Sequence, residues 1–540
     1  MSGSRRTLIN GHFAFTAPHE LATQAGMEVL ADGGHAVDAM IAAAAVIAVA
    51  YPHMNGLGGD GFWLVHEPGQ RPWGVDASGA AGSACTPEWY AEHGFSSIPS
   101  RGPGAALTLA GAVSGWIQAK ATAQETAQRA GIPGPDFAIE RLLSPAITLA
   151  ANGVTISDSL AAASRKVSSQ LSDLPGFRDL YTSDGSPLVA GQTLKNGPLA
   201  ELLSQLCQAG LDSFYRGSIG AELGSQLRGL GSPLGPHDLK AHHATVVSPL
   251  CAEIRFGEVF NLPEPTQGFV SILILALFDR LYEPSWTEAD CIHALIECSK
   301  HAFTLRDSCL PVPDLANVDL RAELQQESIA RHASEIDLTQ VREWSRTSSA
   351  GDTVWMGARD KQGVMVSYIQ SLFWEFGSGV VLPDLGLVWN NRGTSFNLSR
   401  GGQRSLEPGK KPFHTLNPAL LMLKDGSRLI YGAMGGEGQP QTQAAMIARH
   451  LYLDRAPARS ISDPRWLLGR TWGEVEGNLQ IESDMDPHAV TALEKKGHKL
   501  DQVTPKNELM GHAGMIREQV DGSLIAASDP RSDGRGEISE

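Results

Sequence analysis

The residues best suited to chemistry stand where a polar segment meets an apolar strand. Residues 333–352 are polar, and from Trp344 onward they are rich in serine and threonine without hydrophobic periodicity, which predicts an exposed, flexible linker. Thr353 follows it and opens a run of β-branched and aromatic residues typical of a strand. A flexible linker that ends at such a threonine indicates chain processing between Asp352 and Thr353. The plainer interpretation of Thr353 is a routine strand residue.

A second candidate is the pair Gly435 and Gly436, which precedes a predicted helix that runs through Tyr452. Two consecutive backbone N–H groups near a helix N-terminus can donate to the oxygen that becomes negatively charged when a carbonyl is attacked. The same two glycines also suit an ordinary tight turn between a strand and a helix. The sequence alone leaves both interpretations open.

Other motifs for catalysis or ligand binding are absent or misplaced. Residues 56–61 match GxGxxG, but they follow a predicted helix and precede a strand, which is the reverse of a dinucleotide site. We interpret them as a loop in which one backbone approaches another closely. His242 and His243 are adjacent and cannot share a helix face, and no metal-ligand spacing appears, so we expect no metal. No nucleophile elbow of the GxSxG type has a convincing strand–turn–helix context.

Composition limits the class of protein and its partners. The chain has 540 residues, of which 42% are hydrophobic and 19% charged, as in an ordinary globular protein large enough for two lobes. Its formal net charge of −16 argues against nucleic acid and anionic membranes as partners. The longest apolar run, residues 39–50, is too short to span a bilayer, and the N-terminus lacks an apolar signal region. With scattered cysteines and no CxxC pair, we expect a cytoplasmic protein with reduced thiols.

Hydrophobic patterns predict the elements that must position these residues. Residues 20–30 and 38–49 read as helices, the second so apolar that it should be buried between layers. Residues 351–396 predict a hairpin-rich sheet with a tight turn at 360–363. Residues 269–281 predict an apolar helix after a Pro-rich loop.

Seven longer segments are each weak signals alone, but their order along the chain is typical of one protein family. They are QAGMEVLADGGHAVDA (24–39), YPHMNGLGGDGF (51–62), AGAVSG (110–115), SPAITLAANG (144–153), IHALIECSKHAFTLRD (292–307), GAMGG (432–436) and ASDPRSDG (527–534). In this order they resemble the γ-glutamyltransferase (γ-glutamyl transpeptidase) family of N-terminal-nucleophile hydrolases, across nearly the whole chain. The resemblance implies an α+β fold, a four-layer αββα sandwich of two stacked antiparallel sheets between helical layers.

The resemblance also implies how such a chain matures and works. A proenzyme cuts itself before Thr353 into a large chain, residues 1–352, and a small chain, residues 353–540, which stay together as a heterodimer; whether two heterodimers pair is left open. Thr353 becomes the nucleophile, and its freed α-amine, with an ordinary pKa of about 7.7–8.0, serves as its base. Gly435 and Gly436 match the glycines of the oxyanion hole. No metal or organic cofactor is required, because all these groups belong to the protein.

Two positions depart from the family where it holds the amino-acid part of a γ-glutamyl substrate. Ser78 stands where the family has the arginine of its large chain, in Val-Asp-Ala-Ser-Gly. Ser395 replaces the acidic residue that holds the α-amine, in Asn-Asn-Arg-Gly-Thr-Ser-Phe. The catalytic residues therefore match, whereas the groups that grip an α-amino acid do not.

Four other residues become candidates for substrate binding. Arg392 is a new cation near the site, and its guanidinium fork suits a carboxylate, although it could instead be a structural salt-bridge partner. His414 and Thr415 replace paired serines of the family, and His414 could serve packing or hydrogen bonding alone. Ser371 replaces an asparagine after the second strand.

Three functions remain open after this comparison. The favoured one is an autoprocessing threonine amidohydrolase for a small acyl group that bears a carboxylate, as in the divergent branch with oxamate amidohydrolase and cephalosporin (glutaryl) acylase-like members. The second is a genuine γ-glutamyltransferase or glutathione hydrolase with rearranged substrate contacts. The third is a non-catalytic binding protein that has kept the fold.

Overall fold

Two β-sheets stack face to face at the centre of the computed structural model, which describes residues 11–131, 135–309, 319–344, 351–402, 404–469 and 478–539. Neighbouring strands are antiparallel in both sheets. The seven-stranded sheet has the order β22 (Arg535–Ile538), β1 (Ala14–Ala17), β11 (Asp352–Arg359), β12 (Met365–Phe373), β2 (Asp60–His66), β3 (Trp73–Ala77) and β8 (Thr245–Val247). The six-stranded sheet has the order β21 (Leu524–Ser528), β20 (Ala513–Glu518), β16 (Arg428–Ala433), β15 (Ala419–Leu423), β10 (Gly257–Asn261) and β9 (Leu250–Ile254).

The alternation of side chains along the strands builds the core between the sheets. Trp355 and Ile369 of the first sheet pack there with Phe260 and Ile430 of the second. Val354, one residue before Trp355, points to the opposite face and joins the core under the helices. The central strands are therefore apolar on both faces, as the sequence predicts.

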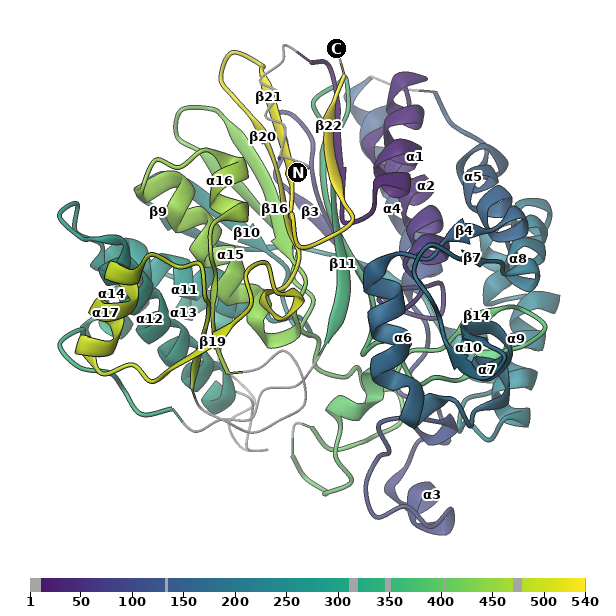
Figure 1. Ribbon diagram of the computed structural model, residues 1–540. Helices are drawn as coiled ribbons and strands as arrows, with labels where there is room; N and C mark the ends of the chain where they lie inside the picture. The colour runs from purple at the N-terminus through teal and green to yellow at the C-terminus, as the bar shows by residue number, and fades with distance from the viewer. Residues whose placement is uncertain are drawn as a thin grey trace.

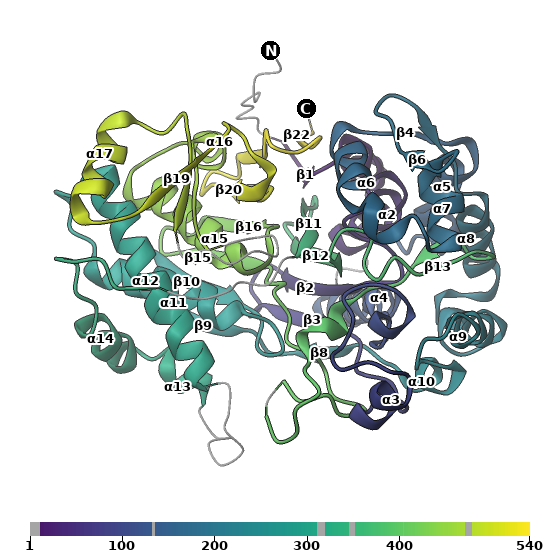
Figure 2. The same cartoon turned by 60° about the horizontal axis from the view of Figure 1, so that its bottom comes forward.

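Helices cover the two outer faces, so the molecule has four layers (Figures 1 and 2). The seven-stranded sheet is covered by α1 (Glu20–Ala31), α2 (Ala36–Ala50) and α4 (Ala112–Ala130), with α5 (Ile139–Asn152) and α8 (Gly197–Ala209) outside α2. The six-stranded sheet is covered by α11 (Gly268–Leu281) and α15 (Gln439–Ile447), and α12 (Glu288–Cys309) packs against both helices. Every residue of α2 is buried, which confirms the prediction for residues 38–49. The αββα arrangement expected from the resemblance is present.

The segments before and after Asp352 are interleaved in both sheets. Strand β11, which begins at Asp352, lies between β1 and β12, and β12 pairs in turn with β2. In the other sheet, β15 pairs with β10. A break in the chain before Thr353 would therefore leave the two parts joined by strand pairing and by shared cores.

The expected linker is more ordered at its ends than its composition suggests. Helix α14 (Gln326–Ser334) extends into its first residues, and its last residues, Gly351 and Asp352, are buried. Residues 345–350 lie outside the described part of the chain. The ends of the linker predicted for 333–352 are therefore not exposed, because helix packing buries Ala333 and strand pairing buries Asp352, whereas residues 334–344 are mostly exposed, as predicted. The flexibility of the segment stays a prediction.

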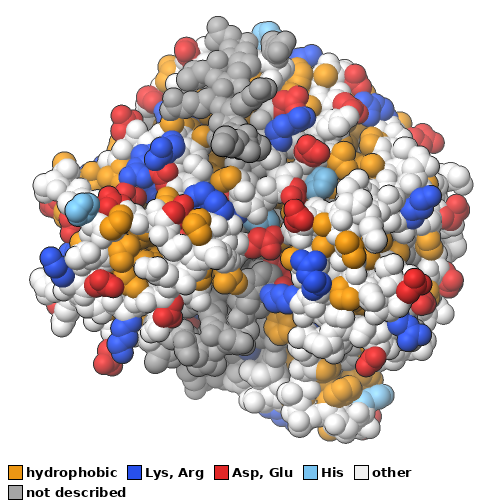
Figure 3. Space-filling model, in the orientation of Figure 1, with side chains coloured by type: hydrophobic (Ala, Val, Ile, Leu, Met, Phe, Trp, Pro, Cys, Tyr) orange, Lys and Arg blue, Asp and Glu red, His pale blue; other side chains and the backbone are white. Residues whose placement is uncertain are grey.

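The surface agrees with the composition of the chain. On the face shown in Figure 3, acidic and basic side chains are interspersed and hydrophobic side chains occur in small groups. Among the described helices, none combines the length and the apolar character needed to cross a membrane.

Candidate active site

The peptide bond between Asp352 and Thr353 lies at an irregularity in the sheet. Asp352 pairs with Phe373 and Val354 pairs with Gln370, so one residue of β11 faces two residues of β12. Phe373 adopts a φ of 84°, which is unusual for a residue with a side chain. Bulges of this kind redirect side chains and are common beside active sites. Thr353 is therefore set apart from the regular ladder that begins at Val354.

Both residues at this bond are buried with polar atoms that lack a partner. Thr353 is 1% exposed, and its Oγ1 has no hydrogen bond. Neither carboxyl oxygen of Asp352 has one. Burial raises the pKa of Asp352 well above its ordinary value, and the charge of Glu375 adds to this, so the neutral carboxyl is favoured. Unpartnered buried polar groups are costly and are kept where function needs them.

Ser371 contacts the carbonyl of the same peptide bond. Its hydroxyl donates to the carbonyl oxygen of Asp352 and accepts the Phe373 N–H at 2.8 Å. The hydroxyl hydrogen is therefore aimed at the oxygen that would gain negative charge if Thr353 attacked the Asp352 carbonyl. The sequence predicts that Ser371 binds the substrate, whereas the structure places its hydroxyl on the peptide bond between Asp352 and Thr353.

Gly435 and Gly436 lie against the segment that leads into this bond. They follow β16 and open the 3₁₀ helix η5 (Gly436–Gly438), with φ values of 122° and 55°. A Cβ built on Gly351 would lie 3.1 Å from the Gly436 Cα, so the two backbones touch. Among the described residues, neither the Gly435 N–H nor the Gly436 N–H has an acceptor. Gln267 holds the turn by donating to the Gly436 carbonyl at 2.9 Å.

Arg392 is brought to the same place by a tight turn. It opens the 3₁₀ helix η4 (Arg392–Ser395), where the Asn390 side chain accepts its N–H at 3.1 Å. Its guanidinium carbon lies 3.8 Å from the ring centroid of Phe373, the residue paired with Asp352. Arg392 is 1% exposed; its Nη1 donates weakly to Thr415 Oγ1 at 3.4 Å, and its Nε has no partner. Burial lowers the pKa of Arg392 to about 9, so it remains charged at neutral pH.

Asp60 and His414 complete this buried cluster. One oxygen of Asp60 accepts the Gly79 N–H at 2.8 Å, while the other lies 3.6 Å from His414 Nε2 and has no hydrogen bond. Burial raises the pKa of Asp60 to about 7, and the charge of Arg392 opposes that shift. Burial lowers the pKa of His414 well below its ordinary value, so its ring is neutral. The cluster therefore holds a cation, an acid whose pKa is raised toward neutrality, and several hydrogen-bonding atoms without a partner.

Two of the residues singled out from the sequence serve local structure. The Ser395 hydroxyl lies 2.9 Å from the Arg392 carbonyl and 3.2 Å from the Phe413 carbonyl, so it ties together the turns that carry Arg392 and His414. The Ser78 hydroxyl donates to Asp76 at 2.5 Å. Both hydroxyl hydrogens are thus engaged by groups within the protein.

Comparison with known proteins decides the family. A sequence profile of the family described as Gamma-glutamyltranspeptidase matches residues 22–539. The chain belongs to the gamma-glutamyltranspeptidase family. The oxamate amidohydrolase proenzyme of Klebsiella pneumoniae is 44% identical over 526 residues, which cover 97% of this chain and 98% of that protein. A glutathione hydrolase-like proenzyme of Bacillus subtilis is 35% identical over 522 residues, covering 96% and 97%.

A solved structure supports the same assignment. The crystal structure of cephalosporin acylase from Bacillus halodurans superposes with a TM-score of 0.86 at 27% identity, covering 100% of this chain and 98% of that one. The mixed α+β fold is thus shared with the gamma-glutamyltranspeptidase family. The chain is an amidohydrolase of this family, which excludes the non-catalytic alternative.

The structure adds two residues to the candidate site that the sequence does not reveal. The sequence places Asp60 in a glycine loop, and the only signal for a further role is that an acid stands among glycines before a strand. Close packing there is real, because a Cβ on Gly59 would lie 2.2 Å from the Ser371 carbonyl oxygen. Gln267, which anchors both Gly436 and the Thr415 carbonyl, had no signal beyond its place after a Pro-rich loop.

Proposed function

We propose that the chain is a proenzyme that cuts itself between Asp352 and Thr353. The Thr353 hydroxyl attacks the Asp352 carbonyl carbon, and Ser371 donates to the oxygen that becomes negative. The C–N bond then breaks, the proton lost by the hydroxyl ends on the nitrogen, and the acyl group has moved from N to O. Water hydrolyses this ester, which leaves a carboxylate on Asp352 and a free α-amine on Thr353.

The mature site then works as a threonine amidohydrolase. The neutral α-amine of Thr353 takes the proton of its own hydroxyl as the oxygen attacks the substrate amide. The N–H groups of Gly435 and Gly436 donate to the oxyanion, and the leaving amine departs with the proton held by the α-amine. Water, activated by the same amine, hydrolyses the acyl ester and frees the carboxylic acid.

The proposed substrate class rests on the position of the Arg392 guanidinium. A buried guanidinium with an unpaired Nε, stacked on the residue opposite Asp352, offers a charged fork close to the reacting carbonyl. A small acyl group whose carboxylate lies near its amide satisfies that fork. Oxamate, in which the two groups are directly bonded, has this form, and the name of the 44% identical relative supports it. Glutaryl amides place the carboxylate farther away.

A γ-glutamyl substrate is the second candidate. The relative that is 35% identical carries a glutathione hydrolase-like name, and the unpaired oxygen of Asp60 could accept an α-ammonium in place of the acid that Ser395 replaces. In this arrangement Arg392 would hold the α-carboxylate of the same substrate. The two candidates differ in whether the substrate needs an ammonium group.

A substrate panel distinguishes these candidates. Purified protein is assayed for ammonia released from oxamate, for glutarate released from glutaryl amides and for p-nitroaniline released from γ-glutamyl-p-nitroanilide, with Thr353→Ala as the inactive control. We expect oxamate to have the highest kcat/KM. Efficient turnover of γ-glutamyl-p-nitroanilide with little turnover of oxamate would establish the second candidate instead.

A further inference from the structure

A group of histidines and carboxylates lies at the edge of the helical layer that covers the six-stranded sheet, apart from the Arg392 cluster. His301 on α12, His332 on α14 and Glu335 at the end of α14 place one ligand atom each within 4.8 Å of one another. Both histidines are largely buried, whereas the Glu335 side chain is 54% exposed. Helix α13 (Leu320–Glu323) lies beside them and contributes Glu323 (Figure 1).

Hydrogen bonding fixes the His332 ring in the tautomer that suits a metal ligand. Its Nε2 lies 2.8 Å from Glu323 Oε2 and 3.3 Å from Arg331 Nη2; because the carboxylate is the nearer partner and can only accept, Nε2 carries the proton. The lone pair of Nδ1 therefore faces His301 Nε2, which is 3.2 Å away. Arg331 donates to the same Glu323 oxygen at 2.6 Å and holds it in place. A carboxylate behind a histidine is the usual support for a histidine that binds zinc.

The spacing fits one ion shared by the two rings. Zinc binds imidazole nitrogen at about 2.0–2.1 Å in a tetrahedral site, which puts two such nitrogens about 3.3 Å apart. The His301–His332 separation of 3.2 Å agrees with this. The nearest Glu335 oxygen lies 3.9 Å from His301 Nε2, and its exposed side chain can turn to approach an ion between the rings. Solvent would supply the fourth ligand.

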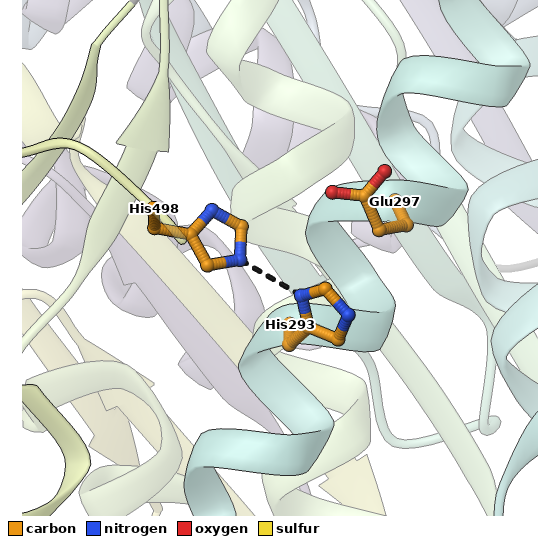
Figure 4. Close-up of side chains that lie close together, drawn as sticks. All are labelled: His293, Glu297 and His498. Carbon is orange, nitrogen blue, oxygen red and sulfur yellow. Dashed lines mark hydrogen bonds between the residues drawn. The ribbon is translucent and has the colours of Figure 1, made fainter. Parts of the chain in front are cut away.

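A second histidine pair, His293 and His498, is hydrogen-bonded directly and leaves no room for an ion between the rings (Figure 4). His293 Nδ1 and His498 Nε2 are 2.8 Å apart, a hydrogen-bond length that is too short for two ligands of one ion. The Glu297 carboxylate also lies within 4.8 Å of both rings, but it is paired with Lys300 Nζ at 2.7 Å (Figure 4). The positive charge of the buried Lys300 side chain would repel a metal cation at this position. This hydrogen bond between the two rings ties α12 to the segment after α17 (Pro487–Lys496).

From this contrast we propose that His301, His332 and Glu335 form a zinc site with water as the fourth ligand and Glu323 as the support of His332. The ion fastens the end of α14 to α12. All of its ligands lie in the outer helical layer, and none touches the Arg392 cluster. Glu323 and Glu335 bring two negative charges to the site, against the positive charges of Arg331, which donates to Glu323, and of Arg342, which lies near His301.

Equilibrium titration of the full-length protein tests the site. After removal of metal with a chelator, Zn²⁺ is titrated in competition with a chromophoric chelator, and Co²⁺ is added separately to read tetrahedral coordination from its visible absorption. We expect one tight site per chain and a higher melting temperature with Zn²⁺. Glu323→Gln should weaken binding about 10–100-fold. Glu335→Gln, at an exposed position that does not endanger folding, should weaken it as well.

Matched variants separate this site from stray binding. The double variant His301→Asn/His332→Asn should lose the site, while His488→Asn, which removes an exposed histidine on α17, should bind as the wild type does. Far-UV circular dichroism of the metal-free variants shows that each is folded. Absence of a tight Zn²⁺ site, or binding that is unchanged in the double variant and in Glu335→Gln, overturns the proposal and leaves an adventitious ion only.

Discussion

Replacing Arg392 tests the proposed substrate contact. Arg392→Lys keeps the charge but loses the planar fork, and Arg392→Met keeps much of the length but loses both. Hydrogen bonds to charged groups contribute about 1.5–3 kcal/mol each, so loss of one such contact in Arg392→Lys should lower kcat/KM for oxamate about 10–150-fold. Loss of the whole buried contact in Arg392→Met costs about 3–5 kcal/mol, or about 150–5000-fold.

The fold should tolerate both substitutions. Without Arg392, the pKa of Asp60 loses the main influence that lowers it, so Asp60 takes up a proton and no unpaired charge stays buried. Self-cleavage should continue, because Ser371 and Thr353 are unchanged. Kinetics with oxamate and with its uncharged analogue oxamide, alongside a denaturing gel, measure these effects. If Arg392→Met still prefers oxamate over oxamide as the wild type does, the assignment of Arg392 to the substrate carboxylate is refuted.

Three further variants probe separate steps. Ser371→Ala removes the donor to the Asp352 carbonyl and should slow self-cleavage about 10²–10³-fold in a time course on gels; wild-type cleavage would contradict that role. Gly436→Ala, at a φ of 55°, should lower kcat by at least 10²-fold, since the N–H it carries moves; unchanged kcat would remove it from the oxyanion hole. Asp60 binds a proton more tightly in the folded state, so wild-type stability relative to Asp60→Asn should fall by up to about 4 kcal/mol between pH 4 and pH 7 in urea unfolding, and a flat difference would contradict it.

Local patterns accounted for much of the fold. The all-apolar run before residue 50 became the buried helix α2, and the turn at 360–363 became the hairpin between β11 and β12, with Gly363 at a φ of 85°. Both elements are determined by residues that are close in the sequence, which is why the sequence predicts them. The four-layer sandwich, by contrast, was predicted only from the resemblance to the family, because composition and local patterns do not show which strands pair.

The parts of the site that escaped prediction depend on contacts between distant segments. Asp60 meets Arg392 and His414 only after β2 and the two later turns come together, and its raised pKa results from burial that no spacing reveals. The proposed metal ligands are similar: His301 and His332 lie on different helices, so they form no motif. Ser395, by contrast, was singled out by alignment with a motif, yet its hydroxyl joins two backbone carbonyls.

The central claim is that Thr353 becomes a new N-terminus, and intact-protein mass spectrometry with N-terminal sequencing tests it most directly. The account predicts two chains that break between Asp352 and Thr353, together with a single uncut and inactive chain for Thr353→Ala. A purified protein that hydrolyses its substrate as one uncut chain, or that is cut at another bond and stays active as Thr353→Ala, would contradict it.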